Sequence, residues 1–322
     1  MAIGKHLAEL GGLPAFDFPH SAENPPDLPA ADAVAWRISV ESWRSKHSWA
    51  DVFASFLDTV DSTRVRALII GNWSTEAAHP QTGGEPVIEA VVAAAGRLPQ
   101  LRALFHGDIT WEENEISWIR PGPAAELLRA YPALRELGIR GSEGLVFPPT
   151  AHRHLETLTI QSGGTPRDVL RGVAASDLPA LTTLDLWLGT SEYGGDGEVA
   201  DLAPILAGDR LPALRHLGLR NSEIQDDICT ALAAAPVLAR LHTLDLSMGV
   251  LTDRGATALL GGQPLTHLKR LDLHYNYLSA EICDRLRETL EPAGVDLDLD
   301  SDGAEDDVED DGSVWRFVSC GE

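Results

Sequence analysis

One spacing of aliphatic residues recurs along most of the chain. A leucine, or once a valine, is followed three residues later by a leucine and, in most copies, two residues after that by Leu or Ile. The eight copies begin at Val65, Leu101, Leu134, Leu155, Leu181, Leu214, Leu241 and Leu268. The last two aliphatic positions alternate as they do in a strand with one buried face. A unit this short cannot bury its own leucines, so each unit must pack on its neighbours.

The eighth copy extends this spacing into a longer pattern. Residues Leu268 to Leu278 read Leu-Lys-Arg-Leu-Asp-Leu-His-Tyr-Asn-Tyr-Leu and resemble the leucine-rich-repeat consensus at every fixed position. The asparagine of that consensus is present in this copy alone, at Asn276. Ala- and Leu-rich stretches that favour helix lie between the strand cores, at residues 87–98, 124–130, 167–175, 199–207, 226–235, 253–260 and 280–290.

Helical stretches between strand cores and steps near 27 residues are similar to the ribonuclease-inhibitor-like type of leucine-rich repeat. The resemblance implies an α/β solenoid of horseshoe shape. Its parallel sheet would be concave, its helices would lie on the convex side, and both ends would be capped. The chain also resembles an uncharacterised bacterial leucine-rich-repeat family through the stretches Leu184 to Gly195 and Leu244 to Asp253. Genes of that family tend to lie near enzymes of the radical-SAM, sulfatase-like and ATP-grasp kinds, which implies a scaffold or partner role.

Composition divides the chain into three regions. Residues 1–63 begin with an extended, proline-rich lead and continue into a strand at Ala33 to Val40 and an amphipathic helix, which together predict an N-terminal cap. The repeats occupy residues 64–300 and end in a closing strand at Val295 to Leu299. Residues 301–322 form an acidic segment, expected to be solvated, and an apolar stretch, Val314 to Val318, expected to pack back as a C-terminal cap. The lead carries prolines at Pro14, Pro19, Pro25, Pro26 and Pro29.

Charge narrows the range of partners. The formal net charge is -24, with only three lysines, so the chain repels phosphate backbones and anionic membranes. We therefore expect no nucleic-acid and no membrane partner, and a protein partner with a basic surface. The three cysteines are far apart and match no ligand spacing, which favours the cytoplasm. No apolar run approaches a membrane span and the N-terminus shows no leader pattern.

Candidate contact residues come from the strand positions that point away from the aliphatic core. In the later repeats these positions carry carboxylates, with a tryptophan and a histidine among them and two arginines in the same columns. A long loop between two repeats adds a tyrosine. The predicted partner-binding residues are Arg140, Asp185, Trp187, Tyr193, Arg220, Asp245, Asp272 and His274.

Two functions and a purely structural role remain open. The first is a non-enzymatic scaffold that binds a protein on the concave face, with Trp187 as an exposed anchor. The second is a cation-binding or enzymatic module built on Asp185, Asp245 and Asp272. No metalloprotease, phosphate-loop or nucleophile-elbow motif occurs, and we expect no cofactor. An EF-hand-like spacing from Asp298 to Glu309 lacks the helix that should precede it, because Pro292 and Gly294 interrupt that helix.

Overall fold

The structure is a computed structural model that describes residues 3–19, 27–41, 47–74, 83–309 and 311–321. Pro25 and Pro26 of the proline-rich lead lie outside the described residues. No helix within these ranges has the length and the apolar character that crossing a bilayer requires.

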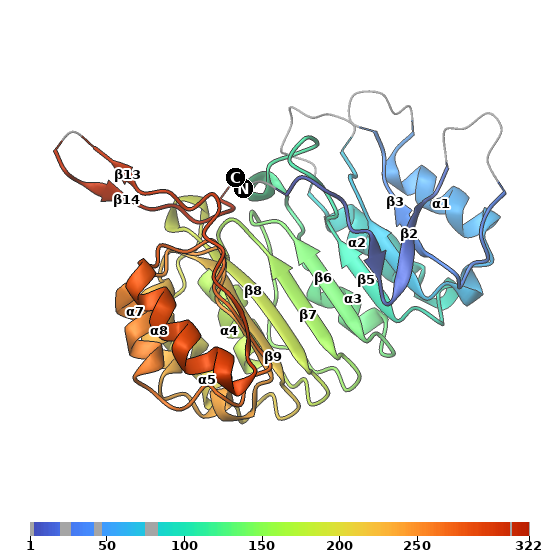
Figure 1. The fold of residues 1–322 in the computed structure, drawn as a ribbon. Coiled ribbons are helices and arrows are strands. Elements are labelled where there is room, and N and C mark those ends of the chain that lie inside the picture. Colours follow the sequence, from blue (N-terminus) through green and yellow to red (C-terminus); the bar gives the residue numbers. More distant parts are fainter. Residues whose placement is uncertain (1–2, 20–26, 42–46, 75–82, 310, 322) are drawn as a thin grey trace.

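A single twelve-stranded sheet runs the length of the molecule, with its strands in sequence order (Figure 1). Strands β1 and β2 are antiparallel, and every later pair of neighbours is parallel. The strands are β1 (Glu9–Leu10), β2 (Leu13–Asp17), β3 (Ala35–Ile38), β4 (Ala67–Ile70), β5 (Ala103–His106), β6 (Glu136–Arg140), β7 (Thr157–Gln161), β8 (Thr183–Gly189), β9 (His216–Ser222), β10 (Thr243–Asp245), β11 (Arg270–Asp272) and β12 (Asp296–Asp298).

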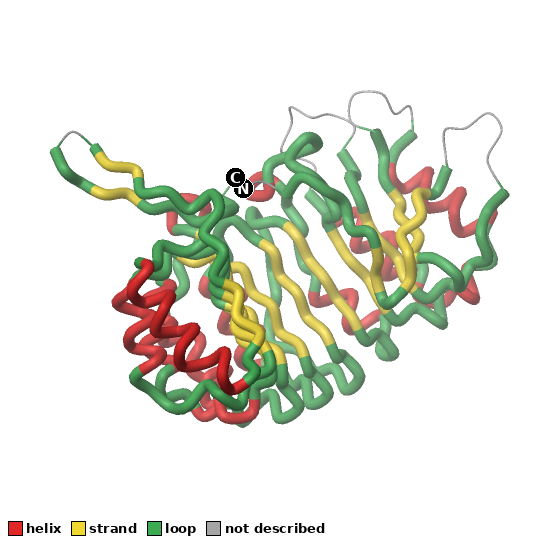
Figure 2. The backbone as a smooth tube through the Cα atoms, in the orientation of Figure 1, coloured by secondary structure: helices red, strands yellow, loops and turns green. Residues whose placement is uncertain are grey.

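The helices lie together on one side of this curved sheet, as the red and yellow tubes of Figure 2 show. The α-helices are α1 (Trp49–Thr59), α2 (Glu85–Ala93), α3 (Ala125–Ala130), α4 (Arg167–Ala175), α5 (Ala203–Ala207), α6 (Gln225–Leu232), α7 (Asp253–Leu260) and α8 (Ala280–Leu290). Short 3-10 turns supplement them: η1 (Ser62–Arg64), η2 (Ala95–Arg97), η3 (Ile116–Trp118), η4 (Ser191–Tyr193), η5 (Val199–Leu202), η6 (Pro236–Arg240) and η7 (Glu291–Ala293). The predicted solenoid, with helices on the convex side, is confirmed.

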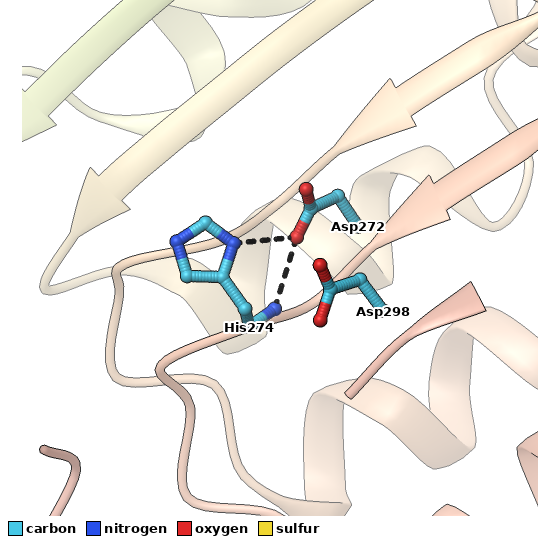
Figure 3. A group of neighbouring side chains, drawn as sticks. All are labelled: Asp272, His274 and Asp298. Carbon is cyan, nitrogen blue, oxygen red and sulfur yellow. Dashed lines mark hydrogen bonds and ion pairs between the residues drawn. The ribbon is translucent and has the colours of Figure 1, made fainter. Parts of the chain in front are cut away.

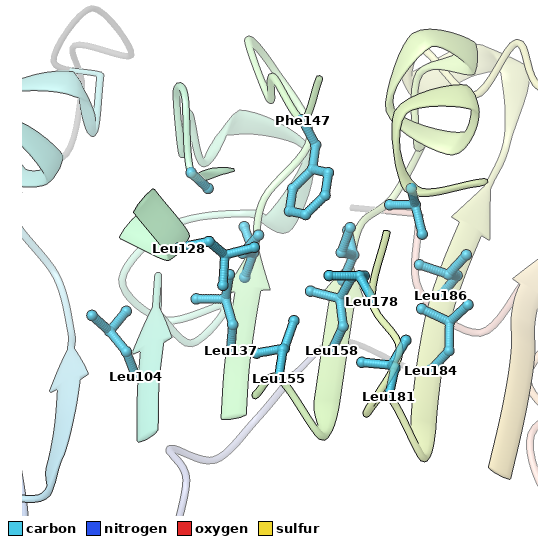
Figure 4. Packing of buried hydrophobic residues seen from close by; sticks show 14 of the residues in the cluster. Leu104, Leu128, Leu137, Phe147, Leu155, Leu158, Leu178, Leu181, Leu184 and Leu186 are labelled. Carbon is cyan, nitrogen blue, oxygen red and sulfur yellow. The ribbon is translucent and has the colours of Figure 1, made fainter. Parts of the chain in front are cut away.

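The repeat leucines form a continuous ladder between sheet and helices. Leu104, Leu137, Leu158 and Leu184 are paired in register on successive strands, and each is fully buried (Figure 4). Because neighbouring strands lie ~4.8 Å apart, each leucine contacts its equivalent on the next turn. Truncating one of them to alanine would cost about 2–5 kcal/mol of stability.

Local chemistry fixes where individual elements begin and how closely they pack. Ser48 and Asp51 form a reciprocal capping box at the start of α1. Gly172 of α4 lies against the connection between β6 and β7, where a Cβ would come 1.7 Å from the carbonyl oxygen of Phe147. Asn276 performs the consensus role: its amide donates to the carbonyls of Leu246 and Leu273.

The two ends of the ladder are closed differently. At the first end Phe16, Phe18 and Phe56 surround Trp36, with ring centroids 5.5–6.3 Å apart. At the other end β12 extends the sheet as the expected closing strand and α8 covers it.

The acidic segment after β12 forms a hairpin that projects from the solenoid, shown in red in Figure 1. Its strands are β13 (Asp307–Val308) and β14 (Val314–Trp315). The expectation that Val314 to Val318 packs onto the repeats is wrong for most of that stretch. Trp315 and Phe317 are 54% and 57% exposed, and only Val318 is buried.

Candidate functional site

The first half of the concave face is covered by the chain itself. Leu10 packs on Ala67, Ile69, Ala103 and Phe105, which point away from the main core. We call residues 3–13 the N-terminal segment. The concave face is therefore not open to a partner along strands β3 to β6, because this segment returns over them.

A buried carboxylate fastens the N-terminal segment. Asp108, two residues after the end of β5, accepts a hydrogen bond from Arg37 Nε at 2.8 Å and lies 3.4 Å from Arg140 Nη1. The backbone N–H of Leu7 donates to both of its carboxylate oxygens at 3.2 Å. Desolvation alone would raise the pKa of Asp108, but the hydrogen bond from His6 and the two arginines bring it below its usual value.

Arg140 is therefore not an exposed contact residue. It is 2% exposed, donates to Gln161 Oε1 at 2.9 Å and to the carbonyl of Ile109, and stacks over Phe105. Its predicted place on the concave face is right, but its guanidinium serves the protein's own packing.

Trp187 is buried as well, so the expectation of an exposed anchor is wrong. Its ring is 6% exposed and packs with Ile116, Met248 and Cys320. The guanidinium of Arg220 lies over the ring of Trp187, with its carbon atom 5.5 Å from the ring centroid.

The C-terminal tail, residues 318–321, provides this cover. Cys320 exchanges two hydrogen bonds with the side chain of Asn221, and Ser319 N–H donates to the carbonyl of Met248. Both chain ends thus meet at the carboxyl edge of the sheet, where Figure 1 places the labels N and C side by side.

We call Asp185, Asp245 and Asp272 the acidic column, and arginines of the chain neutralise its charge. Arg220 lies between the first two aspartates, 3.4 Å from Asp185 Oδ2 and 3.2 Å from Asp245 Oδ2. Burial raises the pKa of Asp185, and the charge of Arg220 opposes that rise. Asp185 and Arg220 are half-buried, and Asp245 is buried.

A second arginine, Arg270, neutralises carboxylates at the end of the sheet. Its guanidinium contacts Asp272 at 2.9 Å, Asp298 at 3.2 Å and Asp296 at 2.7 Å. His274 Nδ1 lies 2.7 Å from Asp272 Oδ1 (Figure 3). Although desolvation would raise the pKa of Asp272, the hydrogen bonds from His274 and Arg270 hold it far below its usual range. The hydrogen bond to Asp272 in turn raises the pKa of His274.

Asp272, His274 and Asp298 also have the donor atoms for a cation. One ligand atom from each lies within 4.8 Å of the others. Carboxylate oxygens with one imidazole can hold a divalent metal. An incoming ion would first have to displace the guanidinium that bridges both carboxylates.

Tyr193 lies at a different place, in the loop after β8. Together with Trp315 and Phe317 it lines a cavity of about 580 Å³ at the carboxyl edge of the sheet. Tyr277 anchors the base of the projecting hairpin there through two hydrogen bonds between its hydroxyl and the backbone of Phe317. We call Tyr193, Trp315 and Phe317 the aromatic rim.

The structure thus separates the predicted contact residues into three groups. Arg140 and Trp187 are buried, Asp185, Asp245 and Asp272 are paired with Arg220 or Arg270, and Tyr193 joins the aromatic rim. Sequence reasoning missed Asp108, Arg270 and the exposure of Trp315. The signal for Arg270 was present, since it stands in β11 two residues before Asp272 and so points to the same face.

Comparisons with known proteins agree with this architecture. No protein-family profile matches the chain. The monocyte differentiation antigen CD14 of Bos taurus is 33% identical over 216 residues, which are 63% of this chain and 50% of CD14. The human protein of the same name is 31% identical over 200 residues, 60% of this chain and 47% of its own length. The chain therefore spans about half the length of the curated relatives it matches.

A solved structure matches over a larger share. A crystal structure of a protein from Bacteroides fragilis superposes with a TM-score of 0.73 and 29% sequence identity, covering 87% of this chain and 76% of the other. CD14 is itself a leucine-rich-repeat protein. The recurring leucines, the parallel sheet of consecutive strands and these similarities lead to one conclusion: the chain folds as a leucine-rich-repeat solenoid.

Proposed function

We propose that this chain is a non-enzymatic scaffold that binds a protein with a basic surface. The partner lies on the later half of the concave sheet, strands β7 to β12, and contacts the aromatic rim. The observation that carries the proposal is the exposure of Trp315 and Phe317 on a hairpin that projects beside an acidic sheet. Large exposed aromatics are typical anchors of protein interfaces.

The later half of the sheet has room for such a partner. Outward-facing side chains such as Thr159, His216, Arg270 and His274 are half-buried rather than covered. Six strands at ~4.8 Å give a width of about 25 Å, which suits an interface of standard size. Asp185 and His274 keep their proposed role as contacts at its floor, whereas the buried Trp187 and Arg140 do not take part.

Charge determines the kind of partner. The net charge is -24, and the projecting hairpin adds exposed carboxylates around its two aromatics, at Glu305, Asp306, Asp307, Glu309 and Asp311. Such a field attracts a basic protein and accelerates its association at low salt. We keep the cytoplasm as the proposed compartment, on the ground of the three widely separated cysteines.

Affinity capture tests the proposal. A double variant, Trp315→Ala with Phe317→Ala, is compared with wild type and with Trp118→Ala, which removes a tryptophan that is 50% exposed but does not line the rim cavity. Quantitative mass spectrometry should find one basic protein depleted at least about tenfold with the double variant and retained by the control. Recovery of the same proteins at equal yield from all three baits would reject the aromatic rim as the docking site.

The cation-binding alternative has one specific observation in its favour, the grouping of Asp272, His274 and Asp298. Arg270 already balances the two carboxylates of this group, so the alternative requires a rearrangement that the scaffold proposal does not. Calorimetric titration with Ca²⁺, Mg²⁺, Mn²⁺ and Zn²⁺ separates the two, because binding heat from any of them in wild type would favour the alternative.

A further inference from the structure

A column rich in basic residues runs along the amino edge of the sheet in an otherwise acidic protein. The residue just before each repeat strand is linked to its equivalent on the next repeat by a backbone hydrogen bond. Arg102 N–H donates to Arg66 O at 2.8 Å, and Arg135 N–H donates to Arg102 O at 2.7 Å. The same column continues with Glu156, Thr182, Arg215, His242 and Lys269. Backbones linked in this way lie ~4.8 Å apart, so the three arginines are stacked neighbours.

The first three members of the column surround a cavity. It has a volume of about 480 Å³, and Arg66, Arg102 and Arg135 line it together with Gly11 from the N-terminal segment. This volume lies in the range of small-molecule sites. The walls are polar, which favours a small charged ligand over an apolar one.

Within the described part of the chain, two of these arginines form no ion pair, although the charge of Arg66 also acts on Asp32. Among the described residues, neither Arg66 nor Arg102 has a carboxylate oxygen within the 4.0 Å of an ion pair, whereas Arg135 pairs with Glu156 at 2.8 Å. The guanidinium of Arg102 donates only to neutral oxygens, such as the carbonyl of Leu101 at 2.9 Å. Like charges on adjacent strands repel one another, and an anion between them relieves that repulsion.

Glu136 is the second carboxylate that lines the cavity, and it repels a bound anion less than a fully solvated glutamate would. Burial raises its pKa, although the backbone N–H of Gly11 donates to its Oε2 at 3.1 Å and acts in the other direction. Glu136 and Glu156 also offer acceptors for hydroxyl or amine groups. The lining as a whole therefore suits a molecule with an oxyanion at one end and hydrogen-bond donors at the other.

We propose that this cavity binds the oxyanion of a small polar molecule, a carboxylate or a phosphate, with Arg66 and Arg102 contacting its oxygens. The site lies at the opposite edge of the sheet from the aromatic rim and does not depend on the protein partner. Guanidinium groups form paired hydrogen bonds with either kind of oxyanion, so the two sources share one recognition chemistry.

Calorimetric titration at constant ionic strength tests this site with inorganic phosphate, citrate and glucose 6-phosphate as probes. Wild type should bind one equivalent of at least one probe, and the probe that binds identifies phosphate or carboxylate as the preferred group. Arg66→Gln and Arg102→Gln should each weaken that binding about tenfold or more, because each removes a charged hydrogen-bond donor. Thermal unfolding of each variant checks that the fold is retained.

Arg215→Gln is the matched control, since Arg215 occupies the same column and its guanidinium also donates to the preceding leucine carbonyl, but it does not line the cavity. Its affinity for the probe should stay within about twofold of wild type. Two results would overturn the site. One is that no probe binds wild type at up to about 10 mM. The other is that Arg215→Gln weakens binding as much as the two cavity variants do, which would reduce the effect to general charge.

Discussion

Asn221 holds Cys320, 99 residues away, through both atoms of its carboxamide: its Nδ2 donates to Cys320 O at 2.5 Å and its Oδ1 accepts from Cys320 N at 2.9 Å. Asn221 is fully buried and its backbone is left-handed, with φ of 51°. Asparagine tolerates that conformation better than most residues. This pair fixes the C-terminal tail across Trp187 and so defines where the concave surface ends.

Replacing Asn221 by glycine should release the tail. Glycine keeps the left-handed backbone at no steric cost, so the change isolates the loss of the two hydrogen bonds. We expect the amide of Cys320 to exchange with solvent at least about tenfold faster, since two buried hydrogen bonds contribute about 1–3 kcal/mol. Hydrogen exchange followed by mass spectrometry measures this. Amides of α8 serve as the internal reference, and unchanged exchange at Cys320 would mean that other contacts hold the tail.

Removing the carboxylate of Asp108 should strongly destabilise the protein. Asp108→Ala leaves Arg37 and Arg140 buried without their shared counter-charge, and such a loss costs about 3–5 kcal/mol. Urea unfolding gives the free-energy difference. The control is Asp58→Ala, which breaks the solvent-exposed pair with Arg97 and should cost at most about 1 kcal/mol. Equal effects of the two variants would show that the N-terminal segment is not fastened through Asp108.

The pair of His274 and Asp272 should make stability depend on pH. The hydrogen bond to Asp272 raises the pKa of His274 in the folded state. The stabilisation is therefore complete below the unfolded pKa of ~6.5 and disappears as pH rises through the folded pKa. His274→Gln should lower the free energy of unfolding at about pH 5.5 and leave it unchanged at about pH 9. A difference from wild type that grows with pH would contradict the assigned charge state.

Arg270 should stabilise the fold by supplying the positive charge between Asp272, Asp296 and Asp298. Arg270→Gln leaves Asp272, Asp296 and Asp298 facing one another without compensation, so the thermal midpoint should fall. Millimolar Ca²⁺ should recover part of the loss in the variant and have little effect on wild type. The comparison is made by differential scanning fluorimetry. If Ca²⁺ stabilised the wild type to the same extent as the variant, the result would support the cation-binding alternative.

The architecture could be predicted because its signals are local and periodic. The leucine spacing identified the strand cores, and the Ala- and Leu-rich stretches identified helices such as α4, α7 and α8 at the residues where they occur. The closing strand at β12 followed from alternation alone. In a solenoid each turn packs on its sequence neighbours, so periodicity carries most of the fold.

The surface could not be predicted in the same way. Trp187 packs against Cys320, and Ile69 and Phe105 are covered by Leu10. Residues 318–321 and 3–13 carry no repeat signal and return from distant parts of the chain. Nothing in the spacing of Trp315 indicates that its hairpin projects while Val318 packs. The stack of arginines from Arg66 to Arg135, by contrast, could be predicted from the aligned repeats, because each arginine follows the first aliphatic residue of its repeat.

Hydrogen exchange on the complex with the captured protein tests the scaffold proposal most directly. We expect slower exchange in β7 to β12 and around Trp315 and Phe317, with exchange in the convex helices α4 to α8 unchanged. Protection confined to those helices, with the sheet and the aromatic rim unaffected, would contradict it.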